Sequence, residues 1–182
     1  MPESMLKIIA MVIAVQIIAG TVFFFIFVFS GAYNLAATAP HTPPVKWVMT
    51  AVRTYSIKAH ARKTIIPAYF PNLNPAGGFT EYDEMCIICH GAPGVARSAI
   101  GKGLYPEPPD LKKVANGLKP EEIYWTISNG LKMAGMPAFS PTHDEASLWR
   151  ITSFVKKLPV VFPAEYQHLR LKAERKGNFH PH

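Results

Sequence analysis

The pattern of apolar and polar positions begins with one uninterrupted apolar run. Residues 8–29 contain no charged side chain, and only Gln16 and Thr21 are polar. A helix of this length spans roughly 33 Å at about 1.5 Å per residue, close to the roughly 30 Å hydrocarbon thickness of a bilayer. A core helix in so small a protein would seldom be apolar on every face, so the run predicts a membrane-spanning helix.

A cleaved signal peptide is the alternative interpretation of this run, because the small residues 37–39 fit a cleavage site. The run is longer than the usual stretch of about 7–15 apolar residues, and Pro40 directly follows the candidate site. We therefore expect an uncleaved single-pass anchor. Lys7 precedes the span and the next basic residue is Lys46, so charge slightly favours a cytoplasmic N-terminus.

Between two groups of prolines the pattern becomes that of a basic amphipathic helix. Apolar residues at 45, 48, 49, 52, 55 and 59 recur at three- and four-residue steps, with the basic residues mostly elsewhere on the helical wheel. This pattern predicts a helix over residues 45–62. The helix could rest on the domain that follows, or it could lie on lipid or on a neighbouring membrane subunit, and the sequence leaves these alternatives open.

Three further helices are predicted over about residues 78–86, 120–129 and 143–157. Pro120 in the first turn and Gly130 after the end mark the second of them. The Gly- and Pro-rich residues 91–109 are expected to form loops, and the chain shows no convincing alternating strand pattern. The predicted fold class is mainly α.

The start of the last of these helices carries a capping signal. Thr142 is followed by Glu145 three residues later, the spacing of a capping box. We therefore expect His143 to lie in the first turn of this helix.

Composition and charge exclude two classes of protein. Of the 182 residues 49% are hydrophobic and only 17% are charged, against roughly 25% charged in an average soluble domain, which excludes a disordered chain. The net charge of +7 is concentrated outside residues 77–163, which contain nine basic and nine acidic residues. This distribution is a poor footprint for nucleic-acid binding, so we expect no nucleic-acid partner.

Both cysteines of the chain lie in the motif Cys86-Ile87-Ile88-Cys89-His90. This C-x-x-C-H spacing attaches c-type haem, because two thiols can add to the vinyl groups on one porphyrin edge while the next residue places an imidazole under the iron. A thioredoxin-like motif would sit in a βαβ pattern, and a structural zinc site would need further close-set ligands. A disulfide would leave His90 unexplained. We predict one covalently attached haem c, bound through Cys86, Cys89 and His90.

A second axial iron ligand is expected from the loop of residues 130–139, in which Gly130 and Gly135 enclose one methionine and Pro137 follows the other. Met136 is the favoured ligand, because Pro137 restricts its backbone and pre-organises the loop. Met133 in the same loop and His143 beyond it are the alternatives.

Together these segments resemble the class I mono-haem cytochromes c of bacteria, and more closely the membrane-anchored cytochromes c of bacterial respiratory chains. The resemblance covers about residues 77–160 and rests on the C-x-x-C-H motif and its flanks, on residues 106–111 and 135–139, and on residues 148–155. It implies a small α-helical fold in which the first and last helices cross, with Gly78 and Tyr82 at the crossing. It also implies that the carbonyl of Pro108 or Pro109 accepts the imidazole N–H of His90, which would fix the ring.

The expected domains are an anchor at residues 1–39, a connector at 40–76, a cytochrome c domain at 77–163 and a basic C-terminal tail at 164–182. With both axial positions filled by protein, we expect one-electron transfer rather than catalysis. A haem-based enzyme or gas sensor with a labile sixth ligand is the alternative, and a mainly structural subunit is a third hypothesis. Haem attachment indicates the periplasmic face of the bacterial inner membrane. The partners expected there are subunits of a membrane redox complex and a soluble electron carrier or oxidase.

Overall fold

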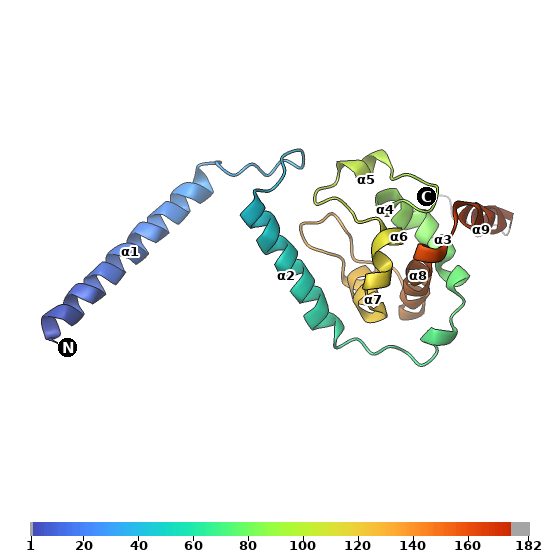
Figure 1. The fold of residues 1–182 in the computed structure, drawn as a ribbon, viewed down its shortest axis with the longest axis horizontal. Coiled ribbons are helices and arrows are strands. Elements are labelled where there is room, and N and C mark those ends of the chain that lie inside the picture. Colours follow the sequence, from blue (N-terminus) through green and yellow to red (C-terminus); the bar gives the residue numbers. More distant parts are fainter. Residues whose placement is uncertain (1, 176–182) are drawn as a thin grey trace. The chain divides into compact units, whose positions relative to one another are not determined.

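Helices make up most of the computed structural model, which describes residues 2–175 (Figure 1). Within these residues there are no β-strands, only two isolated bridges, so the mainly α fold class is confirmed. The part of the C-terminal tail at 176–182 lies outside the described residues. The chain divides into two units, residues 1–39 and 40–182.

The first unit contains one long helix, α1 (Glu3–Phe29), as the apolar run predicts. None of its residues is buried, and it is the one described helix long and apolar enough to cross a membrane. The hydroxyl of Thr21 donates to the carbonyl of Ile17 at 2.8 Å, so this polar group is satisfied inside the helix. The helix ends before Gly31, whose φ of +68° suits a residue that stops a helix.

The second unit is built from short helices and single helical turns around one core (Figure 1). Its elements in chain order are α2 (Pro43–Ala61), η1 (Phe70–Asn72), η2 (Pro75–Gly78), α3 (Phe79–Glu81), η3 (Tyr82–Cys86), α4 (Ile87–His90), α5 (Ala99–Gly103), α6 (Leu111–Val114), η4 (Ala115–Gly117), α7 (Pro120–Asn129), α8 (Glu145–Lys157), η5 (Leu158–Val160) and α9 (Pro163–Arg175).

A crossing between the segment around Gly78 and helix α8 organises the core. A Cβ atom added to Gly78 would lie 2.2 Å from the carbonyl oxygen of Arg150, so the two backbones touch at this point. Tyr82, one turn later, packs its ring 5.2 Å from that of Phe154. The expectation that Gly78 and Tyr82 lie at the crossing with the last helix of the domain is confirmed.

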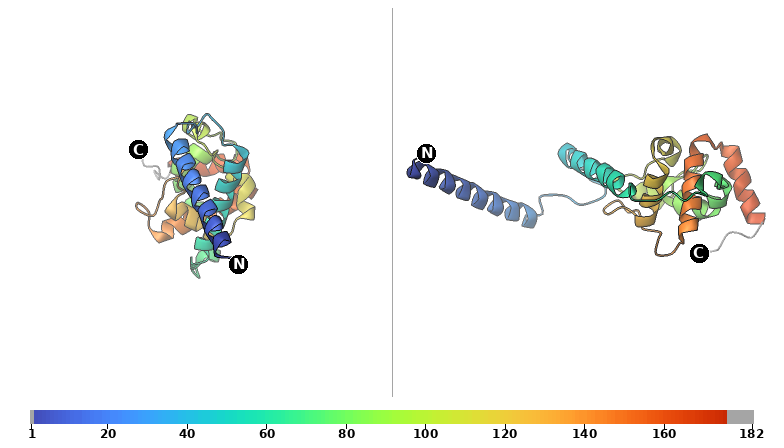
Figure 2. Two further views of the ribbon diagram at one scale, coloured as in Figure 1. Left: turned by 90° about the vertical axis from the view of Figure 1, so that its left-hand side faces the viewer. Right: turned by 90° about the horizontal axis from the view of Figure 1, so that it is seen from below.

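Helix α9 adds to this core, although the sequence predicts only a basic tail from residue 164 onward. The helix lies beside α8 and contacts α3 (Figure 2). Tyr166 is fully buried and its ring lies 5.1 Å from that of Phe79. Its hydroxyl donates to Oδ1 of Asp83 at 2.7 Å, and the same carboxylate accepts from Arg170 Nη2 at 2.6 Å and Nε at 3.1 Å. Asp83 therefore ties α9 to the helical segment just before Cys86.

Replacing Asp83 with alanine is expected to destabilise the second unit by about 3 kcal/mol. Removing one partner of a buried ion pair costs about 3–5 kcal/mol, and the lower end applies because the Arg170 side chain keeps some contact with water. Urea unfolding followed by near-ultraviolet circular dichroism measures this change. Lys113→Ala is the matched control, since its ion pair with Asp110 is exposed and should contribute less than about 1 kcal/mol. Equal effects of the two variants would contradict the role given to Asp83.

The structure corrects the predicted start of the last domain helix. Helix α8 begins at Glu145, and its N-cap is Asp144, whose carboxylate accepts from the backbone N–H of Ser147 at 2.7 Å. The capping box at Thr142 is therefore wrong, and His143 precedes the helix. An Asp carboxylate is a strong N-cap and interacts favourably with the helix dipole, so it prevails over the nearby threonine.

Residues 91–109 are also not all loop, because they contain the five-residue helix α5. The expectation of loops alone is wrong here. Ser98 caps this helix by accepting from the N–H of Gly101 at 3.2 Å.

Candidate functional site

The C-x-x-C-H motif lies at the end of a continuous helical stretch formed by α3, η3 and α4. Cys86 ends the π-helical segment η3, and Cys89 and His90 belong to α4. Residues three apart on a helix lie on neighbouring turns of one side, so Cys86 and Cys89 share a side. Both cysteines are free thiols and only partly buried.

A hydrogen bond joins the start of the π-helical segment to the end of the motif. At its start, the hydroxyl of the buried Tyr82 donates to the carbonyl of Gly91 at 2.7 Å, which joins it to the residue just after His90. Gly91 ends the helix with a φ of +67°. Wide helical turns of this kind are frequent at functional sites, and here the turn sets the position of Cys86.

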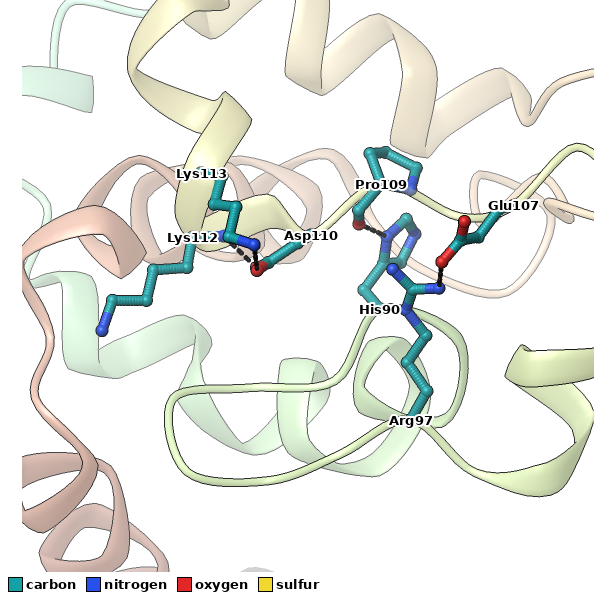
Figure 3. A network of polar contacts seen from close by, with 7 residues as sticks. All are labelled: His90, Arg97, Glu107, Pro109, Asp110, Lys112 and Lys113. Carbon is teal, nitrogen blue, oxygen red and sulfur yellow. Dashed lines mark hydrogen bonds and ion pairs between the residues drawn. The ribbon is translucent and has the colours of Figure 1, made fainter.

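The imidazole of His90 is oriented by a backbone carbonyl. Its Nδ1 lies 2.8 Å from the carbonyl oxygen of Pro109 (Figure 3). With the proton on Nδ1, the other ring nitrogen, Nε2, is free to bind a metal ion. Of the two prolines suggested by the resemblance, the acceptor is Pro109, whereas Pro108 is buried beside it.

The electrostatic surroundings of His90 keep its ring neutral. Burial lowers the pKa of His90, and the nearby charge of Arg97 lowers it further, against the opposing effect of the hydrogen bond to Pro109. Arg97 itself pairs with Glu107 on the loop that leads to Pro109 (Figure 3). A neutral imidazole is the form that binds a metal ion.

Helix α5 and its N-cap residue pack against the backbone of the C-x-x-C-H motif. The N–H and hydroxyl of Ser98 both donate to the carbonyl of Ile88, at 3.1 and 2.9 Å. A Cβ atom on Gly101 would lie 2.5 Å from that same carbonyl oxygen and 2.8 Å from the Cα of Cys89, so only glycine allows this close approach. Neither residue was predicted from the sequence. A serine before a helix is a preferred N-cap and could have indicated Ser98, whereas the close approach at Gly101 has no local signal.

The thiol of Cys86 keeps its proton at neutral pH. The pKa of Cys86 is raised to about 12, mainly by burial and to a smaller extent by negative charge on Cys89 and Glu81. Among residues 2–175 there is no group of three or more His, Cys, Asp or Glu side chains placed to share a metal ion.

The loop of residues 130–139 separates its two methionines. Met136 closes the base of the loop, where its carbonyl accepts from the N–H of Leu131 at 3.1 Å, and its partly buried side chain packs against the core. Met133 has a φ of +58° at the tip of the loop and its side chain is 75% exposed. Cys86 borders the same core cluster as Met136.

The loop is fixed where it meets the rest of the domain. A Cβ atom on Gly130 would lie 2.6 Å from the backbone of Pro137, and one on Gly135 would lie 2.7 Å from the side chain of Leu104. His143, the remaining alternative ligand, places its Nδ1 2.9 Å from the hydroxyl of Thr142 and its ring edge-on to Phe139.

The residues of this site fit a covalently bound haem. Two free thiols lie one turn apart, the next residue offers a neutral imidazole with Nε2 available, and a methionine packs on the same core. This donor set is the one that c-type haem uses.

Comparison with known proteins agrees with this chemistry. Residues 73–155 match the family described as "Cytochrome C oxidase, cbb3-type, subunit III". No curated protein and no solved structure matches the chain. A cytochrome c domain implies covalently bound haem c and a role in electron transfer. Together with the apolar helix α1, the matched domain fits a membrane-anchored mono-haem cytochrome c.

Proposed function

We propose that this chain is a membrane-anchored mono-haem cytochrome that carries single electrons, because residues 73–155 match the family of cbb3-type oxidase subunit III and an apolar helix precedes them. In this proposal it is a subunit or tethered shuttle of a respiratory complex. Residues 1–39 form the anchor, 40–76 the connector, 77–163 the haem domain and 164–182 a tail whose helix packs on that domain.

The proposed site uses five residues. The thiols of Cys86 and Cys89 would add across the two vinyl groups of haem, each giving a carbon–sulfur bond and passing its hydrogen to the neighbouring carbon. Nε2 of His90 and the sulfur of Met136 would bind the iron, and the Pro109 carbonyl holds the imidazole in place. The observation that carries this assignment is the 2.8 Å contact between His90 Nδ1 and the Pro109 carbonyl, next to two free thiols.

Electron transfer follows from the ligand set. Bound haem supplies a reversible one-electron iron couple, and ligation by imidazole and thioether sulfur raises its reduction potential. If His90 and Met136 both bound the iron, no coordination position would be left for a substrate.

A membrane anchor favours redox partners that lie in or at the same membrane. A domain tethered to the membrane meets membrane partners at an effective concentration on the order of millimolar, so a weak docking surface suffices. We propose that the haem domain lies on the periplasmic face of a bacterial inner membrane, where thiols are attached to haem. The family match suggests an oxidase complex as the setting, with a soluble carrier as the other partner.

Purification of the full chain from membranes tests this function. We expect haem staining that survives denaturing electrophoresis, a redox titration that fits one electron and one haem, and co-purification with membrane redox subunits. A colourless protein, or one that holds zinc, would refute the proposal.

Replacing Met136 with alanine is expected to open the sixth coordination position. Carbon monoxide should then bind the reduced protein rapidly at neutral pH, and the reduction potential should fall by on the order of 100 mV, because the thioether ligand favours the ferrous state. Stopped-flow mixing with carbon monoxide and a redox titration measure the two effects.

Met133→Ala is the matched control for this experiment. Its side chain is exposed at the tip of the same loop, so carbon monoxide binding and potential should stay as in the unaltered protein. Rapid binding of carbon monoxide to the unaltered protein would contradict the proposed electron-transfer function. It would favour the alternative function, an enzyme or gas sensor with a labile sixth ligand.

A further inference from the structure

Helix α2 uses one side of its surface to hold the domain. Ala61 is buried and Thr54 and Ile57 are partly buried on this side, which packs against α7. Near the end of the helix the ring of His60 stacks on that of Trp125 at 5.4 Å. One side of α2 therefore rests on the domain that follows, which was one of the two alternatives that the sequence left open.

The opposite side of α2 carries apolar residues that the domain does not use. Val48, Val52, Tyr55 and Ala59 follow one another at four- and three-residue steps and so form one stripe along the helix. Val48 is 46% exposed, Val52 58% and Tyr55 72%. We call these four residues the α2 stripe. On a helical wheel the stripe points away from the side that carries Thr54, Ile57 and Ala61.

Basic side chains lie along one edge of the α2 stripe. Arg62 and then Lys58 follow this edge on the helical wheel, whereas Lys46 and Arg53 lie further round the helix, and all four are exposed. No aspartate or glutamate occurs in the sequence between Glu3 and Glu81. The helix therefore combines an apolar stripe, a basic edge, no acidic residue and an exposed tyrosine, which is the pattern of a helix that lies in a membrane interface.

The chain keeps α2 close to the bilayer if α1 spans it. Helix α1 ends at Phe29 and α2 begins at Pro43, so residues 30–42 join them. At about 3.3–3.6 Å per residue, this linker reaches at most roughly 45 Å. A tethered basic helix is thus held at high local concentration beside the lipid headgroups.

We propose that the α2 stripe lies on the surface of a bilayer that contains anionic phospholipid. This inference rests on the proposed anchoring by α1. The apolar side chains enter the interface while Lys58 and Arg62, which lie beside the stripe, reach the phosphate groups. Since the other side of α2 is packed on α7, docking of α2 also holds the cytochrome domain close to the membrane.

Spin labels on the full-length protein in nanodiscs test the proposal. A label at Val52→Cys is compared with one at Gln167→Cys, an exposed position on α9, with haem attached so that the native cysteines do not react. In discs with anionic lipid we expect the label at 52 to be shielded from a water-soluble nickel complex and accessible to oxygen. The label at 167 should stay accessible to nickel, and the contrast should disappear in zwitterionic lipid at high salt.

Charge removal provides a quantitative check. Each basic residue near an anionic surface strengthens binding about fivefold, so Lys58→Gln with Arg62→Gln should lower the ratio of docked to undocked α2 about 25-fold. Lys113→Gln with Lys157→Gln is the matched control, because these exposed lysines lie outside α2, and it should leave the ratio unchanged.

Three outcomes would overturn the inference. The first is equal nickel access at positions 52 and 167 in anionic discs. The second is a label at 52 that is exposed in discs yet shielded in the native complex, since a protein subunit would then cover the stripe. The third is a haem-containing chain that does not enter discs, which would refute the proposed anchoring as well, whereas the first two leave that anchoring intact.

Discussion

Replacing both Cys86 and Cys89 with alanine is expected to abolish haem that survives denaturation. Their thiols are proposed to form the two carbon–sulfur bonds to the porphyrin, and either bond alone would keep haem on the denatured chain. Alanine is the best helix former and both side chains that it replaces are only partly buried, so the helical stretch itself should persist. Haem staining after denaturing electrophoresis should fall to background, while circular dichroism should still show helical secondary structure.

Ile88→Ala is the matched control for this variant. Ile88 lies between the two cysteines, its side chain is 39% exposed, and its backbone carbonyl still accepts both hydrogen bonds from Ser98 after the change. We expect normal staining and an unchanged absorbance spectrum for this control. Covalent haem in the protein that lacks both cysteines would refute the assignment of the motif.

The elements that could be predicted from the sequence are those with strong local signals. The helix over 120–129 has the bounds that Pro120 and Gly130 predict, because one residue suits a first turn and the other adopts a φ of +64° after the last turn. The apolar run before residue 30 and the amphipathic pattern before residue 62 likewise gave helices with bounds close to those expected. In these segments local propensity and the final structure agree.

The parts that could not be predicted depend on contacts between distant residues. Helix α5 has five residues, too few to be stable alone, and it is held by Ser98 and Gly101 against the motif. Helix α9 has a weak apolar pattern, and only the bonds from Tyr166 and Arg170 to Asp83 make it part of the core. No window of sequence around residue 166 shows that its partner lies at residue 83.

The candidate site also has parts that the sequence predicts and parts that only the structure shows. The spacing of Cys86, Cys89 and His90 is local and could be read directly, whereas the choice between Pro108 and Pro109 depends on how a distant loop meets the ring. Met136 and Met133 lie in one loop, and the sequence favoured the first only through Pro137. The structure adds the difference in exposure between the two side chains.

Replacing Gly78 with alanine is expected to destabilise the second unit by about 3 kcal/mol or more. The new Cβ would lie 2.2 Å from the carbonyl oxygen of Arg150, 2.4 Å from its carbonyl carbon and 2.7 Å from the N–H nitrogen of Ile151. All three are backbone atoms of α8, so no side-chain rotation relieves the overlap. The two elements must move apart, which loosens the contacts of Tyr82 with Phe154.

Because a domain of this kind is stable by only about 5–15 kcal/mol, the Gly78→Ala protein should unfold at a clearly lower urea concentration. Gly103→Ala is the matched control, since a Cβ there meets no atom within 4 Å, and its stability should change by less than about 1 kcal/mol. Haem absorbance and near-ultraviolet circular dichroism follow both transitions. If Gly78→Ala unfolds at the same urea concentration as the control, the backbone contact between Gly78 and α8 does not hold the helical stretch before Cys86 in place. A crossing that accepts a Cβ atom 2.2 Å from the carbonyl oxygen of Arg150 must have room to move.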